Sequence, residues 1–133
     1  MSQFPSWSDE LAVGNSQIDI QHRQLVAICN RASRCAESSE VDARREFFSV
    51  LNDFATLIAE HFDAEEKFLA LNNCPTLAEH RAHHERFRER LLDLLFSGTA
   101  GLLDKKTLAR LARDYLLSHL TETDLPNKHY MRE

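Results

Sequence analysis

The sequence has little glycine and little proline, with three residues of each in 133. Folds rich in tight turns draw heavily on both residues, so their scarcity favours helices over hairpins. Cysteine is scarce as well: Cys29, Cys35 and Cys74 are odd in number and form no C-x-x-C pair. In a reducing compartment such residues are free thiols that fill apolar space.

Three further features are missing. No apolar stretch approaches the roughly 20 residues needed to cross a bilayer. The start of the chain, MSQFPSWSDE, lacks the basic residues and apolar run of a secretion signal. No basic patch is visible, and the formal net charge of −5 argues against binding to phosphate backbones. We therefore expect a cytoplasmic protein with no membrane insertion and no nucleic-acid partner.

The composition that is present is that of an ordinary globular protein, with 43% hydrophobic and 28% charged residues. A chain of 133 residues can bury one core, so we expect one domain over residues 1–133. After an arm of about residues 1–15, apolar residues recur at helical spacing in four segments, about 17–38, 42–72, 76–96 and 104–124. Amphipathic helices with short connections predict an all-α, antiparallel up-down four-helix bundle, with Phe4 and Trp7 of the arm packed on it.

Polar residues mark the expected helix ends. Residues 97–101 are expected to end the third helix, and Pro126 is expected to stop the fourth. The expected N-terminal caps are, in chain order, Ser16 (with Asp19), Asp42, Thr76 (with Glu79) and Asp104.

The informative residues are polar ones on the apolar stripes of these helices. The five histidines on the stripes are His22, His61, His80, His84 and His119, and Glu65 lies on a stripe as well. Burying an ionised carboxylate is costly unless it is paired, and no stripe carries a Lys or Arg. A metal bound by neutral imidazoles and carboxylates together would compensate for that cost.

The spacing of these residues supports a metal site. His61 and Glu65 are four residues apart, as are His80 and His84, so each pair lies on one face of its helix. Asp124 is less clear, because it follows His119 by five residues and lies about 140° round an ideal helix from it. An inward Asp124 requires a π-type distortion or a displaced helix end.

Other interpretations remain open from the residues alone. A lone core histidine is more often hydrogen-bonded than metal-bound, so a metal-free helical interaction module is an alternative. Glu66, His83 and His129 lie off the stripes and are interpreted as surface residues. Ferritin-like di-iron oxidases carry E-x-x-H pairs, which this chain lacks. A zinc protease is excluded because Arg81 stands where its catalytic glutamate would be.

Four segments, in order, resemble the hemerythrin family, and in particular its single-domain bacterial members. The resemblance spans about residues 7 to 124, and its ordered set of motifs is specific. The segments are VGNSQIDIQH (13–22), HFDAEEKFL (61–69, like H-F-x-x-E-E), CPTLAEHRAHHERF (74–87, like P-x(4)-H-x(3)-H-x(2)-F) and YLLSHLTETD (115–124, like H-x(4)-D).

The resemblance implies a non-haem di-iron centre that binds dioxygen reversibly. It implies that His80, His84 and His119 bind one iron and that His22 and His61 bind the other. Glu65 and Asp124 would bridge the two irons together with a solvent-derived oxygen. Of about twelve positions on two six-coordinate irons one then remains open, on the iron with two histidines, and dioxygen would bind there. Leu116 and Leu120 would line the oxygen pocket.

By this resemblance the protein is an oxygen carrier or store rather than an enzyme. A di-iron sensor of oxygen, redox state or nitric oxide, or an iron-handling protein, is the alternative on the same scaffold. A protein partner could receive the oxygen or a signal, and a monomer is slightly favoured. The chain departs from the family's common pattern at Leu69, Cys74, Tyr115 and Leu120, where Met, Tyr, Trp and Ile are usual. None of these changes removes a ligand.

Overall fold

The computed structural model describes residues 7–37 and 43–133, and these residues are all-helical, with no strand among them. The fold class predicted from the sequence, a four-helix bundle, is confirmed. The described part of the chain contains no helix that is both long and apolar enough to span a membrane. Phe4 and Asp42 lie outside the described residues. In chain order the elements are the 3-10 helix η1 (Asp9–Leu11), α1 (Ser16–Glu37), α2 (Ala43–Leu71), α3 (Leu77–Thr99), α4 (Lys105–Asp114), the π-helix η2 (Tyr115–Asp124) and the 3-10 helix η3 (Leu125–Tyr130).

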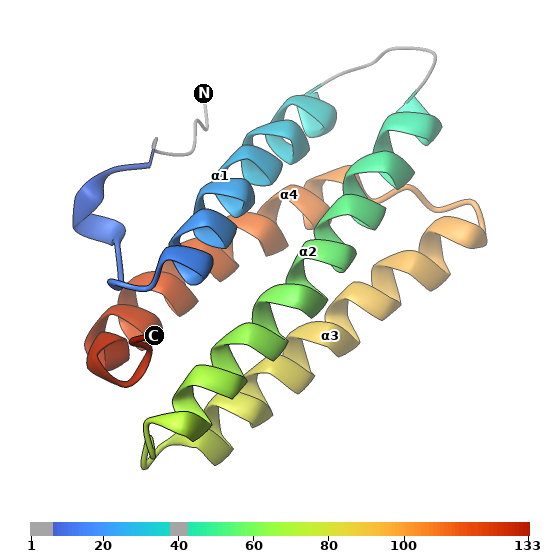
Figure 1. Ribbon diagram of the computed structural model, residues 1–133. Helices are drawn as coiled ribbons and strands as arrows, with labels where there is room; N and C mark the ends of the chain where they lie inside the picture. Colours follow the sequence, from blue (N-terminus) through green and yellow to red (C-terminus); the bar gives the residue numbers. More distant parts are fainter. Residues whose placement is uncertain (1–6, 38–42) are drawn as a thin grey trace.

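Each long helix runs back along the one before it (Figure 1). The end of α1 and the start of α2 lie at one end of the bundle, and the turn between α2 and α3 lies at the other. α1 packs closely against α2 and α4, and α2 also packs against α3. α3 and α4 are not among the closely packed pairs of the described chain. The α3 and α4 backbones therefore lie farther apart than those of the closely packed pairs.

The first helix begins one residue earlier than expected, and its cap is a different residue. Asn15 caps α1, because its Oδ1 accepts from the Ile18 N–H at 3.1 Å. Asp19 Oδ1 instead accepts from the Val13 N–H at 2.8 Å. The Ser16 hydroxyl donates to Glu133. Asparagine and serine are comparable caps, so the sequence pattern alone could not separate these neighbours.

The third helix differs from its prediction at both ends. It starts at Leu77, and the Thr76 side chain makes no capping hydrogen bond. It continues through Gly98 to Thr99, past the break expected from residue 97 onward. Gly98 is buried, and a Cβ added there would come within 3.1 Å of the rings of Phe47 and Phe48. This glycine serves close packing inside the helix; Gly101, with φ of +98°, lies just after the helix end.

The fourth helix is not a single α-helix. Asp104 caps it as predicted, accepting from the Thr107 N–H at 3.0 Å. From Tyr115 to Asp124 the backbone widens into a π-helix, and the chain then tightens into η3, where Pro126 occupies the first turn. Proline is tolerated at that position because its missing N–H has no partner to lose. Pro126 therefore follows the fourth helix without ending the helical path.

Two apolar clusters fill the interior. The larger one lies between the four helices and includes Leu25, Phe54 and Ile58, and Trp7 of the arm packs against it. The smaller one joins Ile18 and Ala64 to the buried Met131 near the C-terminus. Along α1 and α2 the polar residues of the stripes fall between the two clusters.

Candidate metal centre

All the polar residues predicted to lie on the stripes are buried at one level of the bundle. Their exposed fractions are 0–2%, apart from 8% for His119 on η2. The helices α1, α2, α3 and η2 each contribute at least one of them. The structure therefore brings together His22, His61, Glu65, His80, His84, His119 and Asp124.

The π-helix is what turns Asp124 inward. Its hydrogen bonds run from each N–H to the carbonyl five residues earlier, as from Leu125 to Leu120. Residues five apart then lie on the same side of the helix, as they do not in an α-helix. His119 Nε2 accordingly lies 3.0 Å from Asp124 Oδ1. The distortion that the sequence required for an inward Asp124 is present.

Glu65 is at the middle of the cluster. Its Oε2 lies 2.9 Å from His61 Nε2, one helical turn back on α2. Its Oε1 lies 3.1 Å from His84 Nε2 and 3.2 Å from His119 Nε2. One fully buried carboxylate therefore faces imidazoles from three elements.

Six of the seven residues, all except His119, form two groups of potential ligands that share this carboxylate. One group contains His22, His61, Glu65 and Asp124, and the other contains Glu65, His80 and His84. Within each group the ligand atoms lie within 4.8 Å of one another. In the first group Asp124 Oδ2 is 3.2 Å from His22 Nε2.

Glu65 Oε1 has hydrogen-bond geometry to His84 and His119, but the other short distances do not describe ordinary hydrogen bonds. Glu65 Oε2 and both Asp124 oxygens accept no well-aligned hydrogen bond from the described residues, although imidazole nitrogens lie about 3 Å away. Buried carboxylate oxygens are rarely left without partners. The lone pairs of these oxygens and of the imidazole nitrogens face shared points between the side chains instead of forming separate hydrogen bonds. Imidazole nitrogens and carboxylate oxygens arranged in this way fit a metal centre.

Electrostatics also favour a cation here. Burial would lower the pKa of His22, but the neighbouring Asp124 and Glu65 carboxylates outweigh it and raise that pKa to about 9. Burial would also lower the pKa of His119, but the charges of Asp124 and Glu65 outweigh it and raise that pKa to about 10. Burial would raise the pKa of Glu65, but the charges of His61 and His119 hold it well below its usual value. Protons on two imidazoles thus balance two buried carboxylates, a role that metal ions can take over.

Two side chains orient the candidate ligands from behind. Gln21 Oε1 accepts from His61 Nδ1 at 2.9 Å, and Glu66 Oε2 accepts from His84 Nδ1 at 2.7 Å. Each contact places the ring proton on Nδ1 and leaves Nε2 free to face the centre. The sequence interpretation of Glu66 as a plain surface residue is wrong in this respect: it is partly buried and bonded to a candidate ligand. His83 and His129 are exposed, as predicted.

Comparison with known proteins identifies the scaffold. The sequence model of the family described as the hemerythrin HHE cation binding domain matches residues 13–125. The chain belongs to the hemerythrin family. The match contains all seven residues of the centre, so the resemblance seen in the sequence motifs is confirmed at family level.

Named relatives of the hemerythrin domain come from distant organisms. A hemerythrin-like protein of Naegleria gruberi is 26% identical over 123 residues, which cover 92% of this chain and 90% of that protein. A myohemerythrin of Riftia pachyptila is 28% identical over 122 residues, covering 92% and 89%. A bacteriohemerythrin of Stenotrophomonas maltophilia (strain R551-3) is 26% identical over 118 residues, covering 89% and 75%.

Aromatic and aliphatic side chains enclose the centre of this hemerythrin domain. The Phe62 ring stacks on His84 at 3.8 Å between centroids, and the Tyr115 ring stacks on His119 at 4.6 Å. Leu116 and Leu120 are buried in the larger apolar cluster. Their role as walls of an oxygen pocket stays a prediction.

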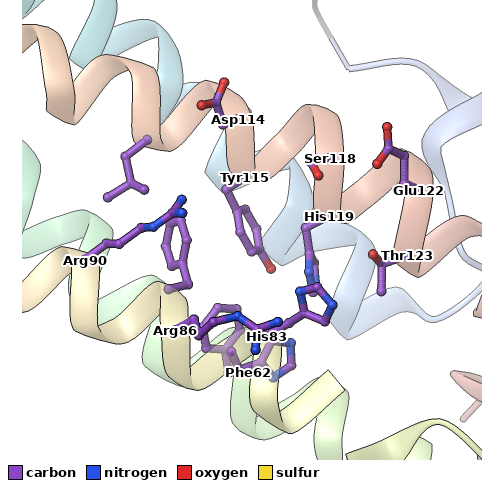
Figure 2. Close-up of a pocket in the computed structure, with 13 residues that line it drawn as sticks. Phe62, His83, Arg86, Arg90, Asp114, Tyr115, Ser118, His119, Glu122 and Thr123 are labelled. Carbon is purple, nitrogen blue, oxygen red and sulfur yellow. The ribbon is translucent and has the colours of Figure 1, made fainter. Parts of the chain in front are cut away.

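A cavity of about 240 Å³ adjoins the hemerythrin centre between α3 and η2 (Figure 2). Both His84 and His119 line it, with Phe62 and Tyr115 beside them. Its outer walls carry exposed polar side chains, so the cavity opens to the surface on that side. Those side chains include His83, Arg86, Arg90, Asp114, Ser118 and Glu122.

Proposed function

We propose that this hemerythrin domain binds two iron ions and uses them to bind dioxygen reversibly. The observation that carries the proposal is the sharing of Glu65 by two groups of potential ligands. One carboxylate with two oxygens can bridge two ions, whereas a single ion would leave one of the two groups unused. The family description supports cation binding.

The candidate ligand sets come from these groups and, for His119, which lies in neither group, from the family pattern. His80, His84 and His119 would hold one ion. His22 and His61 would hold the other, while Glu65 and Asp124 would bridge them. The set is rich in imidazole and has only two carboxylates. Imidazole donors suit iron, zinc and copper, and the family pattern selects iron among them.

Iron in this setting would supply the electrons and the open coordination position that dioxygen needs. The chain's own residues would do the remaining work. Gln21 and Glu66 fix the ring orientation and tautomer of His61 and His84, which raises the basicity of those rings. The two apolar clusters on either side of the centre would keep water from reaching it along the bundle interior, and so limit proton delivery to a bound oxygen molecule.

The competing function on the same scaffold is a sensor or an oxidase. Ferritin-like oxidases place several more glutamates around their irons. Here the buried acidic side chains of the centre are only Glu65 and Asp124 among the described residues. This donor set favours reversible binding over oxygen activation. A protein partner or a nitric oxide response would add to this function without changing the centre.

The test is an absorption spectrum of the purified protein, reduced without oxygen and then exposed to air, with iron counted per chain. We expect about two irons per chain, and visible bands that form with oxygen and vanish when oxygen is removed. Irons that oxidise at once, with no reversible band, would favour a redox sensor. One zinc or no iron would contradict the proposal.

A matched pair of variants on α2 ties the result to the proposed ligands. Glu65→Gln keeps the shape of the side chain but removes the buried charge, and we expect it to lose most of its iron. Glu60→Gln is the control, because Glu60 is exposed on the same helix. Equal iron content in the two variants would show that Glu65 is not a ligand.

A further inference from the structure

The cavity between α3 and η2 is placed where a small molecule could reach the centre. It contains two candidate ligands, His84 and His119, in its wall. Two other surface hollows, one between α3 and α4 and one between α2 and α3, have no candidate ligand in their walls. The cavity lies where the α3 backbone stands apart from α4 and η2.

The inner wall of the cavity is a pair of aromatic rings. Phe62 and Tyr115 lie side by side, with 5.7 Å between their centroids. Tyr115 also meets His61 edge-on at 6.1 Å. Tyr115 thus contacts one candidate ligand from each set, His119 and His61. A molecule that passes this ring moves from the His119 side of the centre to the His61 side.

The Tyr115 hydroxyl is buried and lacks a partner in the described part of the chain, although the residue lines the cavity. Tyr115 is 5% exposed, and its hydroxyl has no hydrogen-bond partner among the described residues. A buried hydroxyl without a partner is costly, so native structures satisfy it with protein or ordered water. The adjoining cavity, at about 240 Å³, is large enough for several water molecules, each of which occupies about 30 Å³ in the liquid. Its lining is partly polar, as a hydrated cavity requires.

We propose that this cavity is the access route by which small ligands reach the centre, and that Tyr115 is its inner barrier and hydrogen-bonding group. The ligands are diatomic or triatomic molecules, including small anions that accept a hydrogen bond. The inference rests on the proposed function, because it needs the His61 side of the centre to take an external ligand. It adds the path and the residue that controls the rate.

The test uses azide and the oxidised, iron-loaded protein, with binding followed by stopped-flow absorption. Ser118→Trp puts a bulky ring at the exposed mouth of the cavity. Because a blocked path slows entry and exit alike, the association and dissociation rates should both fall by about fivefold or more, with the dissociation constant unchanged within about twofold. Tyr115→Leu replaces the aromatic ring at the inner end of the path with a smaller side chain, so the azide association and dissociation rates should both rise.

Ala59→Trp is the matched control, since it fills the hollow between α2 and α3 without contacting the centre. Unchanged rates in Ser118→Trp, with a normal azide spectrum, would overturn the access route and leave the proposed centre standing. Absence of any azide or oxygen band in the unmodified protein would overturn the proposed function, and the route with it.

A crystal structure of the iron-loaded protein gives an independent readout. We expect a water or small anion within hydrogen-bonding distance of the Tyr115 Oη, and its loss in Tyr115→Phe. A dry cavity, with the hydroxyl bonded to a protein group, would overturn the role given to Tyr115.

Discussion

The two side chains behind the histidines offer a sharp test of the centre. Glu66 contacts His84, a candidate ligand of one ion, and Gln21 contacts His61, a candidate ligand of the other. Glu66→Ala and Gln21→Ala each remove one such contact and leave every proposed ligand in place. Each variant should therefore weaken the binding of one iron and leave the binding of the other unchanged.

The size of the effect follows from the geometry. Both contacts are short, and each holds a ring whose other nitrogen faces the centre. Losing an orienting partner of a metal-bound histidine lowers metal affinity about 10- to 100-fold, or about 1.4–2.7 kcal/mol. Glu66→Ala should lie at the upper end, because a carboxylate raises the basicity of His84 more than an amide does. Glu66→Gln should lie closer to the unmodified protein, since its amide oxygen can still accept from the ring.

The assay is iron per chain after equilibration with a graded series of chelator concentrations. In each variant, one iron should be lost at a chelator concentration about 10- to 100-fold lower than the concentration that removes the second iron. A plateau should therefore appear near one iron per chain. Glu60→Ala, on the exposed side of α2, is the control. If Glu66→Ala released iron at the same concentrations as this control, the orienting role of Glu66 would be wrong.

Three further predictions concern the rest of the chain. Removing the proposed metal should speed amide hydrogen exchange most in Tyr115–Asp124, because two candidate ligands lie on this π-helix, and exchange in the core of α2 should change little. Asp104→Ala should cost about 1 kcal/mol in urea unfolding, and Asp104→Asn much less. Hydrogen bonds from the Thr107 hydroxyl and N–H hold the pKa of Asp104 below its ordinary 3.8, so this contribution is present above that pH and is lost as pH falls through the lowered pKa. Cys29, whose pKa burial raises to about 12, should resist alkylation in the native protein and react on unfolding; fast native labelling would contradict its burial.

The sequence predicted the bundle and most of the centre because both depend on the same helical period. His22, His61 and Glu65 fall on apolar stripes, and a residue on such a stripe is buried whatever its polarity. Asp124 was different. Its five-residue spacing from His119 fits no α-helix, and the family pattern selected it where periodicity could not. The wider turn of η2 is the physical reason.

What the sequence missed depends on contacts between helices. Gln21 precedes His22 in the chain yet bonds His61 on another helix, and no spacing rule indicates that pairing. Glu66 follows Glu65 directly, and only the packing of α3 against α2 shows that it reaches His84. The only available signal for Glu66 was its position directly after Glu65, a stripe residue of the same charge. The cap of α1 was missed for a simpler reason, since Asn15 and Ser16 are both good caps and adjacent.

The distribution of the proposed ligands has a consequence for biosynthesis. His22 and Asp124 are 102 positions apart by their numbering, yet their side chains meet at 3.2 Å. Beside them, Asn15 donates to the Met131 carbonyl, a contact that joins positions 116 apart. A ribosome that has made only the first three helices has therefore not yet made His119 or Asp124. The nascent chain then lacks part of the proposed ligand set, so we expect the proposed irons to bind only once the last helix docks.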